Sequence, residues 1–388
     1  MAERVDGNHW GLRSGSINIP KVDVPSICVE DAGSQGPGSM TMARCIHAIR
    51  LGGLAIWLSA AACGPLAAQS GNQTTKYRGA CDGSAAVALD SNFFAVADDD
   101  HNVLRVYRIG QPDSNPSLDV DQFLEAAKKK KKRGFKEADI EGAARVGGRI
   151  YWIGSHGRDS DGETEPTRSR FFATRVRPDP AGPRLEPIGS QAYKTLREDM
   201  FADPKLADLM LADAYAPGEK DGPAPESENG FNMEGLAAAP DGRLFIGFRN
   251  PRPAKQAIVI TLDNPQEVID AGKKPVFGGS MPLDLEGRGI RGIEWIDNRY
   301  LIIAGPHGKA SKSDIKPPFA LFTWDGERAS RPQIVPDITF PNDFAPEAMF
   351  AIPGTAKIVL LSDDGDLDCK DKDEAQRTFR GMTLLLPK

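Results

Sequence analysis

A two-segment apolar pattern recurs five times along the 388-residue sequence. Each copy has an acidic residue at the start of a first apolar segment, then a turn and a second apolar segment. The copies open at Asp82, Glu141, Glu234, Glu294 and Glu347. Self-similarity of this kind is the sequence signature of repeat architectures. Repeated antiparallel hairpins predict an all-β fold, a β-propeller with five blades, with six blades as the alternative.

The hairpin geometry predicts which residues lie near these acids. The start of the first strand of an antiparallel hairpin lies beside the end of the second strand. The residues that end the second segments are, in chain order, Asp98, His156, Arg249, His307 and Asp363. If each acid opens the innermost strand of its blade, the five acids converge at one mouth of the central channel.

The first 68 residues differ in character from the rest. Residues 1–39 are polar and without hydrophobic periodicity, and we interpret them as a disordered segment that precedes the true start. Residues 40–68 have the basic start, the apolar run and the small residues of a signal peptide. This predicts export to the periplasm or secretion, with lipid attachment at Cys63 as an alternative to cleavage near Ala68. The apolar run is too short for a stable membrane span.

The remaining residues, 75–388, predict a single propeller domain. The interval from Glu141 to Glu234 exceeds those that follow, and helical spacing within it predicts a small helical insertion at about 190–230, in the second blade. A degenerate sixth blade is the alternative. The last blade lacks one strand, which residues 75–78 could supply as an outer strand.

Cys81 and Cys369 are the two cysteines that follow the signal peptide. One opens the first repeat and the other follows the last. Because an oxidising compartment permits disulfides, the pair could close the ring, although cysteine count alone does not show proximity.

The mouth of the channel is the candidate site. His156 and His307 suit acid–base catalysis or metal ligation, or they are loop histidines bonded to turn carbonyls. Arg249 and Arg291 could hold an anionic ligand or neutralise the acids. Asp98 and Asp363 are further candidate ligand-binding residues.

The five repeated acids are candidate metal ligands. They are Glu141, Glu234, Glu294, Glu347 and Asp82. Clustered carboxylates repel one another, and Ca²⁺ or another divalent cation would relieve that repulsion. Alternatively, each acid accepts backbone N–H bonds and braces neighbouring blades. The formal net charge of −6 argues against nucleic-acid binding, and we expect a monomer with a small anionic ligand or a protein partner.

The segments 77–89 and 97–107 carry a family resemblance. The sequence from about Tyr77 onward resembles an uncharacterised family of exported bacterial β-propellers, a domain of unknown function. More loosely, the Glu-Gly opening is similar to calcium-dependent lactonase propellers and to the esterase-like propellers grouped with phytase, which implies a metal role for the Glu. A shared fold does not transfer a function.

Two functions follow as hypotheses. The first is a metal-dependent hydrolase of phosphoester, ester or lactone substrates, with cation-binding acids, histidine acid–base groups and arginines that orient the substrate. The second is a non-catalytic periplasmic propeller that binds a ligand or a protein. Motifs for other chemistries, such as a P-loop or a G-x-S-x-G elbow, do not occur.

Overall fold

The computed structural model describes residues 73–115, 117–129, 134–308, 317–365, 369 and 372–386. The predicted disordered segment 1–39, the predicted signal peptide 40–68 and Cys63 lie outside the described residues. The described residues all belong to one compact unit.

Five four-stranded antiparallel sheets make up this unit. The first contains β2 (Ala85–Ala88), β3 (Phe93–Ala97), β4 (Val103–Arg108) and β5 (Leu118–Asp119). The second contains β6 (Ile140–Val146), β7 (Arg149–Gly154), β8 (Phe171–Arg177) and β9 (Arg184–Pro187). The third contains β10 (Asn232–Ala238), β11 (Leu244–Asn250), β12 (Ala257–Leu262) and β13 (Phe277–Leu283). The fourth contains β14 (Gly289–Ile296), β15 (Arg299–Gly305), β16 (Ala320–Trp324) and β17 (Gln333–Ile334).

The fifth sheet closes the ring. It consists of β18 (Ala345–Ala351), β19 (Lys357–Asp363), β20 (Thr378–Leu385) and β1 (Gln73–Arg78). β1 pairs with β20, so the start of the described chain supplies the outer strand of the last blade, as predicted. A disulfide joins Cys81 to Cys369 with their Cα atoms 5.7 Å apart, directly beside this closure.

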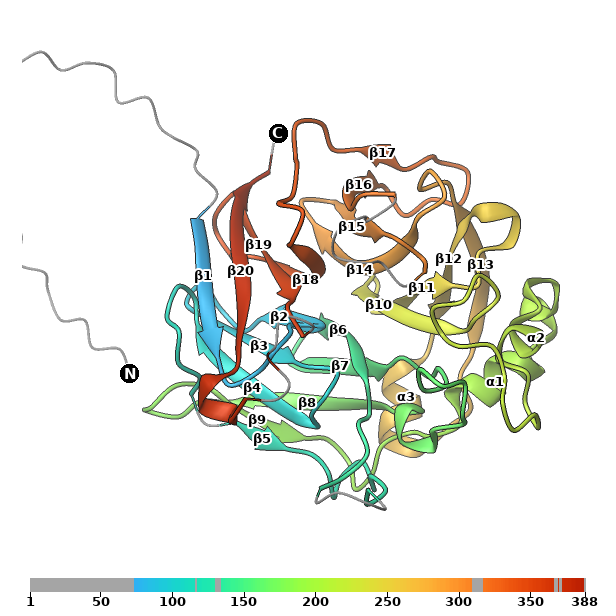
Figure 1. Cartoon of the computed structure of the whole chain (residues 1–388), viewed down its shortest axis with the longest axis horizontal. Coiled ribbons are helices and arrows are strands. Elements are labelled where there is room, and N and C mark those ends of the chain that lie inside the picture. The colour runs from blue at the N-terminus through green and yellow to red at the C-terminus, as the bar shows by residue number, and fades with distance from the viewer. Residues whose placement is uncertain are drawn as a thin grey trace, which may run out of the picture. The chain divides into compact units, whose positions relative to one another are not determined.

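The sheets fan around a common axis, and the prediction of an all-β, five-bladed propeller is confirmed (Figure 1). The first strand of each blade is innermost, and neighbouring inner strands contact one another around the channel. Apolar side chains alternate on the blades and pack into separate clusters between neighbouring blades. The tight turns at Gly147 and Gly242 have φ of 58° and 89°, which glycine adopts without steric cost.

The predicted helical insertion lies between the second and third blades. It contains α1 (Leu196–Ala202), the 3₁₀ helix η2 (Pro204–Leu209) and α2 (Leu211–Tyr215). Its apolar residues join the core between these two blades. The other helices of the described part of the chain are η1 (Pro166–Arg168), η3 (Pro253–Lys255), α3 (Pro265–Ala271) and η4 (Glu374–Gln376). Within the described residues, every helix is too short to cross a membrane.

Candidate functional site

A β-bulge near the start of the inner strand defines one equivalent position in four blades. The strand register skips one residue there, so that two residues oppose one on the partner strand. The skipped residues are Glu141, Glu234, Arg291 and Glu347. Bulges re-aim side chains, and here they direct charged groups to the mouth of the channel. In the first blade Asp82 precedes Gly83 as Glu141 precedes Gly142, so it holds the same place in the sequence pattern.

The fourth blade differs from the sequence-based expectation. Arg291, and not Glu294, occupies the bulge position. Glu294 pairs with Leu301 further along the strand and lines a second, narrow part of the channel. Burial there raises the pKa of Glu294 to about 8. The predicted ring of five acids is therefore four acids and one arginine, with Glu294 outside the mouth.

A cavity of about 410 Å³ opens at this mouth. Its lining is dominated by charged side chains from all five blades. The acids are Asp99, Asp100, Glu137, Asp139, Glu141, Glu226, Glu234, Asp343, Glu347 and Asp363, and the bases are Arg168, Arg249 and Arg291. A cavity of this size suits a small molecule, and its excess of carboxylates favours bound cations.

Arginines neutralise the acids on one side of the cavity. Glu234 forms ion pairs with Arg249 at 3.0 Å and Arg291 at 2.9 Å, and accepts a hydrogen bond from Asn232 at 2.6 Å. Arg291 also pairs with Glu347. The structure thus brings Glu234 and Arg249 together as the hairpin geometry predicts. It also commits both arginines to protein carboxylates.

The carboxylates of the first and second blades form two close groups at the mouth. One oxygen each of Asp99, Asp139 and Glu141 lies within 4.8 Å of the others, and Asp82, Asp99 and Asp100 form a second such group. Burial, then the nearby charges of Glu234, Asp139 and Asp99, hold the pKa of Glu141 well above its ordinary value. Burial also raises the pKa of Asp139, although Arg168 lies 2.8 Å away.

The donor set fits a divalent cation. Glu141 is 9% exposed and makes no hydrogen bond or ion pair with any described residue. Asp82 is 1% exposed, and its Oδ2 atom has no hydrogen-bond partner among the described residues. Its pKa is held well above the ordinary value, mainly by burial and then by Asp98. Carboxylate oxygens of this kind are the ligands that Ca²⁺ and Mg²⁺ prefer.

The two candidate catalytic histidines lie outside the cavity lining. His156 is fully buried, its Nδ1 lies 2.8 Å from the carbonyl oxygen of Gly154, and burial lowers its pKa to about 3. His307 uses its carbonyl oxygen to accept hydrogen bonds from Arg249 and Asn250. Burial also lowers its pKa. The structure therefore gives neither imidazole the placement that acid–base catalysis in this cavity requires.

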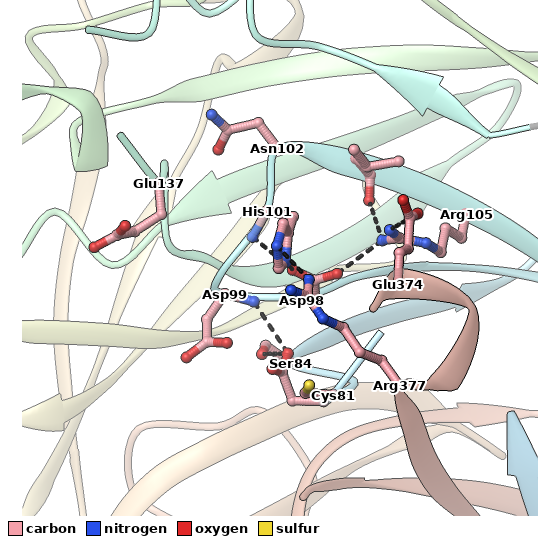
Figure 2. A network of polar contacts seen from close by, with 12 residues as sticks. Cys81, Ser84, Asp98, Asp99, His101, Asn102, Arg105, Glu137, Glu374 and Arg377 are labelled. Atoms are coloured by element: carbon pink, nitrogen blue, oxygen red, sulfur yellow. Dashed lines mark hydrogen bonds and ion pairs between the residues drawn. The ribbon is translucent and has the colours of Figure 1, made fainter. Parts of the chain in front are cut away.

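Asp98 and Asp363 have different surroundings. Asp363 lines the cavity. Asp98 is buried at the junction of the first and last blades, where it pairs with Arg105 at 2.7 Å and with the His101 ring at 3.1 Å (Figure 2). Asp98 is thus part of the ring closure rather than of the cavity lining.

Sequence reasoning missed Asp99, Asp139, Asn232 and Arg168. A usable signal existed for two of them. Asp139 and Asn232 each stand two residues before a repeated Glu, and alternate residues of a strand point to the same side. Asp99 follows the second strand of its blade directly, and no periodic pattern marks it or Arg168.

Comparisons with known proteins match part of the chain to a family of unknown function. No curated protein matches the sequence. Similar solved structures include an exo-1,5-alpha-L-arabinanase from a bovine ruminal metagenomic library, with TM-score 0.42, 8% identity and coverage of 80% of this chain and 94% of that one. The PQQ-bound aldose sugar dehydrogenase of Streptomyces coelicolor has a TM-score of 0.39 and 12% identity, with coverage of 81% of this chain and 98% of that one. Myxococcus xanthus glutaminyl cyclase has a TM-score of 0.38 and 11% identity, with the same two coverages. Residues 187–354 match the model of the family described as "Protein of unknown function (DUF3616)", which confirms the resemblance to a family of unknown function.

Proposed function

We propose that this propeller binds Ca²⁺ or a similar divalent cation at the channel mouth, through Asp99, Asp139 and Glu141. The observation that supports this most strongly is the convergence of three carboxylates within 4.8 Å, one of them a buried Glu141 without a protein partner. Such a group is unfavourable while it carries only negative charge. A hard cation would satisfy the oxygens and offset their repulsion.

The proposed activity is hydrolysis of a phosphoester, ester or lactone. A bound cation polarises a carbonyl or phosphoryl oxygen, or lowers the pKa of a bound water. The residues of the cavity would hold the cation and shape a space of about 410 Å³ for a small substrate. Because Arg249 and Arg291 are already paired with Glu234 and Glu347, we expect the cation rather than these arginines to contact an anionic substrate.

A non-catalytic binding propeller is the second candidate. The observation that favours it is that neither His156 nor His307 lines the cavity, so the mouth lacks the imidazole groups that the hydrolase hypothesis assigned to proton transfer. In this case the cation would fix a ligand, such as a sugar, or would serve ring stability alone.

Isothermal titration calorimetry with Ca²⁺, Mg²⁺ and Mn²⁺ tests the cation site. We expect Glu141→Gln and Asp139→Asn each to weaken binding at least tenfold, because charged oxygen ligands dominate affinity for these ions. Asp241→Asn is the matched control, since Asp241 is exposed at the β10–β11 turn, at the opposite end of its blade from the bulge. Absence of binding to the wild-type protein would refute the proposal.

A hydrolase screen separates the two candidates. The cation-loaded protein is assayed on generic phosphoesters, carboxyl esters and lactones, with and without EDTA. Turnover that EDTA and Glu141→Gln both abolish supports the hydrolase, and binding without turnover supports the second candidate. A periplasmic or secreted location remains part of this proposal, and a disulfide such as Cys81–Cys369 is typical of oxidising compartments.

A further inference from the structure

The junction between the first and last blades lies directly beside the proposed cation site. Cys81 is bonded to Cys369 and is followed at once by Asp82. Asp82 accepts a hydrogen bond from the backbone N–H of Asp99 at 3.0 Å, and Asp99 belongs to both carboxylate groups. The disulfide is thus one residue away from Asp82, which contacts Asp99, the residue common to both carboxylate groups.

Besides the disulfide, charged side chains form a second connection between the first and last blades, next to Asp99 (Figure 2). Asp98, the residue before Asp99, pairs with Arg105, and Arg105 pairs in turn with Glu374 at 2.8 Å. His101 contacts Asp98 through Nδ1, and its Nε2 lies 2.6 Å from Arg377. Cys369, Glu374 and Arg377 all belong to the segment that connects β19 to β20 within the last blade, which we call the returning segment.

These two connections, the disulfide and the ion pairs, both affect the positions of Asp82 and Asp99. Asp82 and Asp99 each follow directly after a residue that is linked to this returning segment. The positions of both carboxylates therefore depend on how firmly the segment is fastened to the first blade. Asp82 is 1% exposed, and so is Asp98, which fixes the backbone next to the half-buried Asp99.

We propose that the Cys81–Cys369 disulfide acts as a redox control on the cation site. The inference rests on the proposed function, since it concerns the affinity of that same site. With the disulfide intact, Asp82 and Asp99 hold the arrangement that binds the cation. With the disulfide reduced, the returning segment loses its covalent tie, and the affinity falls.

The redox step needs a dithiol as the reductant. One dithiol gives two electrons and two protons to the S–S bond, which breaks to give the thiols of Cys81 and Cys369, while the dithiol becomes a cyclic disulfide. The two cysteines are 1% and 3% exposed, so attack requires local opening of the junction. Linkage is reciprocal, so the cation must make the disulfide harder to reduce by the factor by which the disulfide strengthens cation binding.

Calorimetry with Ca²⁺ compares the full-length wild type with the double variant Cys81→Ala/Cys369→Ala. Ca²⁺ is chosen because thiolates are poor ligands for it. We expect the double variant to bind about tenfold more weakly, within the usual range of coupling between sites. The control is Leu384→Ala, which removes a buried side chain from β20 far along the strand from the junction network. It should lower stability without changing the affinity for Ca²⁺.

A second measurement covers the case in which the double variant does not fold. The folded wild type is equilibrated with dithiothreitol at graded Ca²⁺ concentrations, and the reduced Cys81 and Cys369 are counted by alkylation and mass spectrometry. Saturating Ca²⁺ should shift the reduction equilibrium about tenfold toward the disulfide. Equal Ca²⁺ affinity in both proteins, or a reduction equilibrium that Ca²⁺ leaves unchanged, would overturn the redox control while leaving the proposed function intact. Failure of the wild type to bind any divalent cation would overturn both.

Discussion

Arg291 offers a direct test of how the mouth of the channel is stabilised. It occupies the bulge position that three other blades fill with Glu, and it pairs with Glu234 at 2.9 Å and with Glu347. The three side chains are 8%, 3% and 7% exposed, so these are buried ion pairs. Replacement by leucine, Arg291→Leu, removes the charge and keeps an apolar side chain of moderate size.

The expected loss of stability follows from what each acid retains. Glu234 keeps Arg249 at 3.0 Å and Asn232 at 2.6 Å. Glu347 loses the sole ion pair that it makes among the described residues. Removing one partner of a buried pair leaves an uncompensated charge and costs about 3–5 kcal/mol. Since a domain's whole free energy of unfolding is about 5–15 kcal/mol, this variant should be severely destabilised.

Urea denaturation in EDTA at neutral pH measures the effect. The double variant Arg291→Leu/Glu347→Leu should recover much of the lost stability. It removes both charges, whereas the single variant leaves the buried Glu347 carboxylate without a partner. Arg243→Leu is the control, since Arg243 forms an exposed pair with Asp241 that is worth less than about 1 kcal/mol. If Arg291→Leu cost no more than this control, the assignment of Arg291 as the stabilising charge of the mouth would be wrong.

Three further predictions concern other parts of the ring. Removing the disulfide with Cys369→Ala should lower the free energy of unfolding by about 2–5 kcal/mol, measured by urea denaturation; a smaller change would show that β1–β20 pairing closes the ring without it. Burial raises the pKa of Glu294 from 4.5 to about 8, so the folded state holds a proton that the unfolded state releases, and this contribution to stability is lost as pH rises from about 4.5 to 8. Glu294→Gln should therefore flatten the fall in stability between pH 5 and pH 8, and an unchanged pH profile would contradict the burial argument. Arg158 is 1% exposed and donates hydrogen bonds to the carbonyl oxygens of Tyr215 and Ala216, so Arg158→Met should speed limited proteolysis between residues 216 and 222; an unchanged cleavage pattern would show that the insertion is held by its apolar contacts.

The sequence predicts the architecture well because each blade is encoded by a local pattern that repeats along the chain. Alternating apolar segments and turn residues identify the hairpins, and the missing strand of the last blade identifies residues 75–78 as its partner. The site is less predictable, since some of its carboxylates lie outside the repeated two-segment pattern. Asp99 reaches Asp139 and Glu141 only because the first and second blades are neighbours around the axis.

The fourth blade shows which feature of the repeat is most constrained. A Cβ atom on Gly292 would lie 2.5 Å from the carbonyl oxygen of Glu347, and one on Gly235 would lie 2.9 Å from Ile293. Inner strands press against the next blade at this point, so steric limits restrict the residue after the bulge to a very small one. The small residue, which is glycine in four blades and Ala348 in the fifth, is therefore a better guide to register than the acid before it. Aligning Gly292 with Gly235 assigns Arg291 to the mouth and makes the intervals on either side nearly equal.

The charge at the bulge is free to change sign because its energy depends on its neighbours. Five carboxylates in a narrow mouth would repel one another and would require bound cations throughout. One arginine in the ring converts part of that repulsion into ion pairs with Glu234 and Glu347. This leaves the side of the ring that carries Asp82 and Glu141 without equivalent compensation, because neither acid forms an ion pair with a described residue. The position of Arg291 thus explains why a cation is expected on one side of the channel mouth and not at its centre.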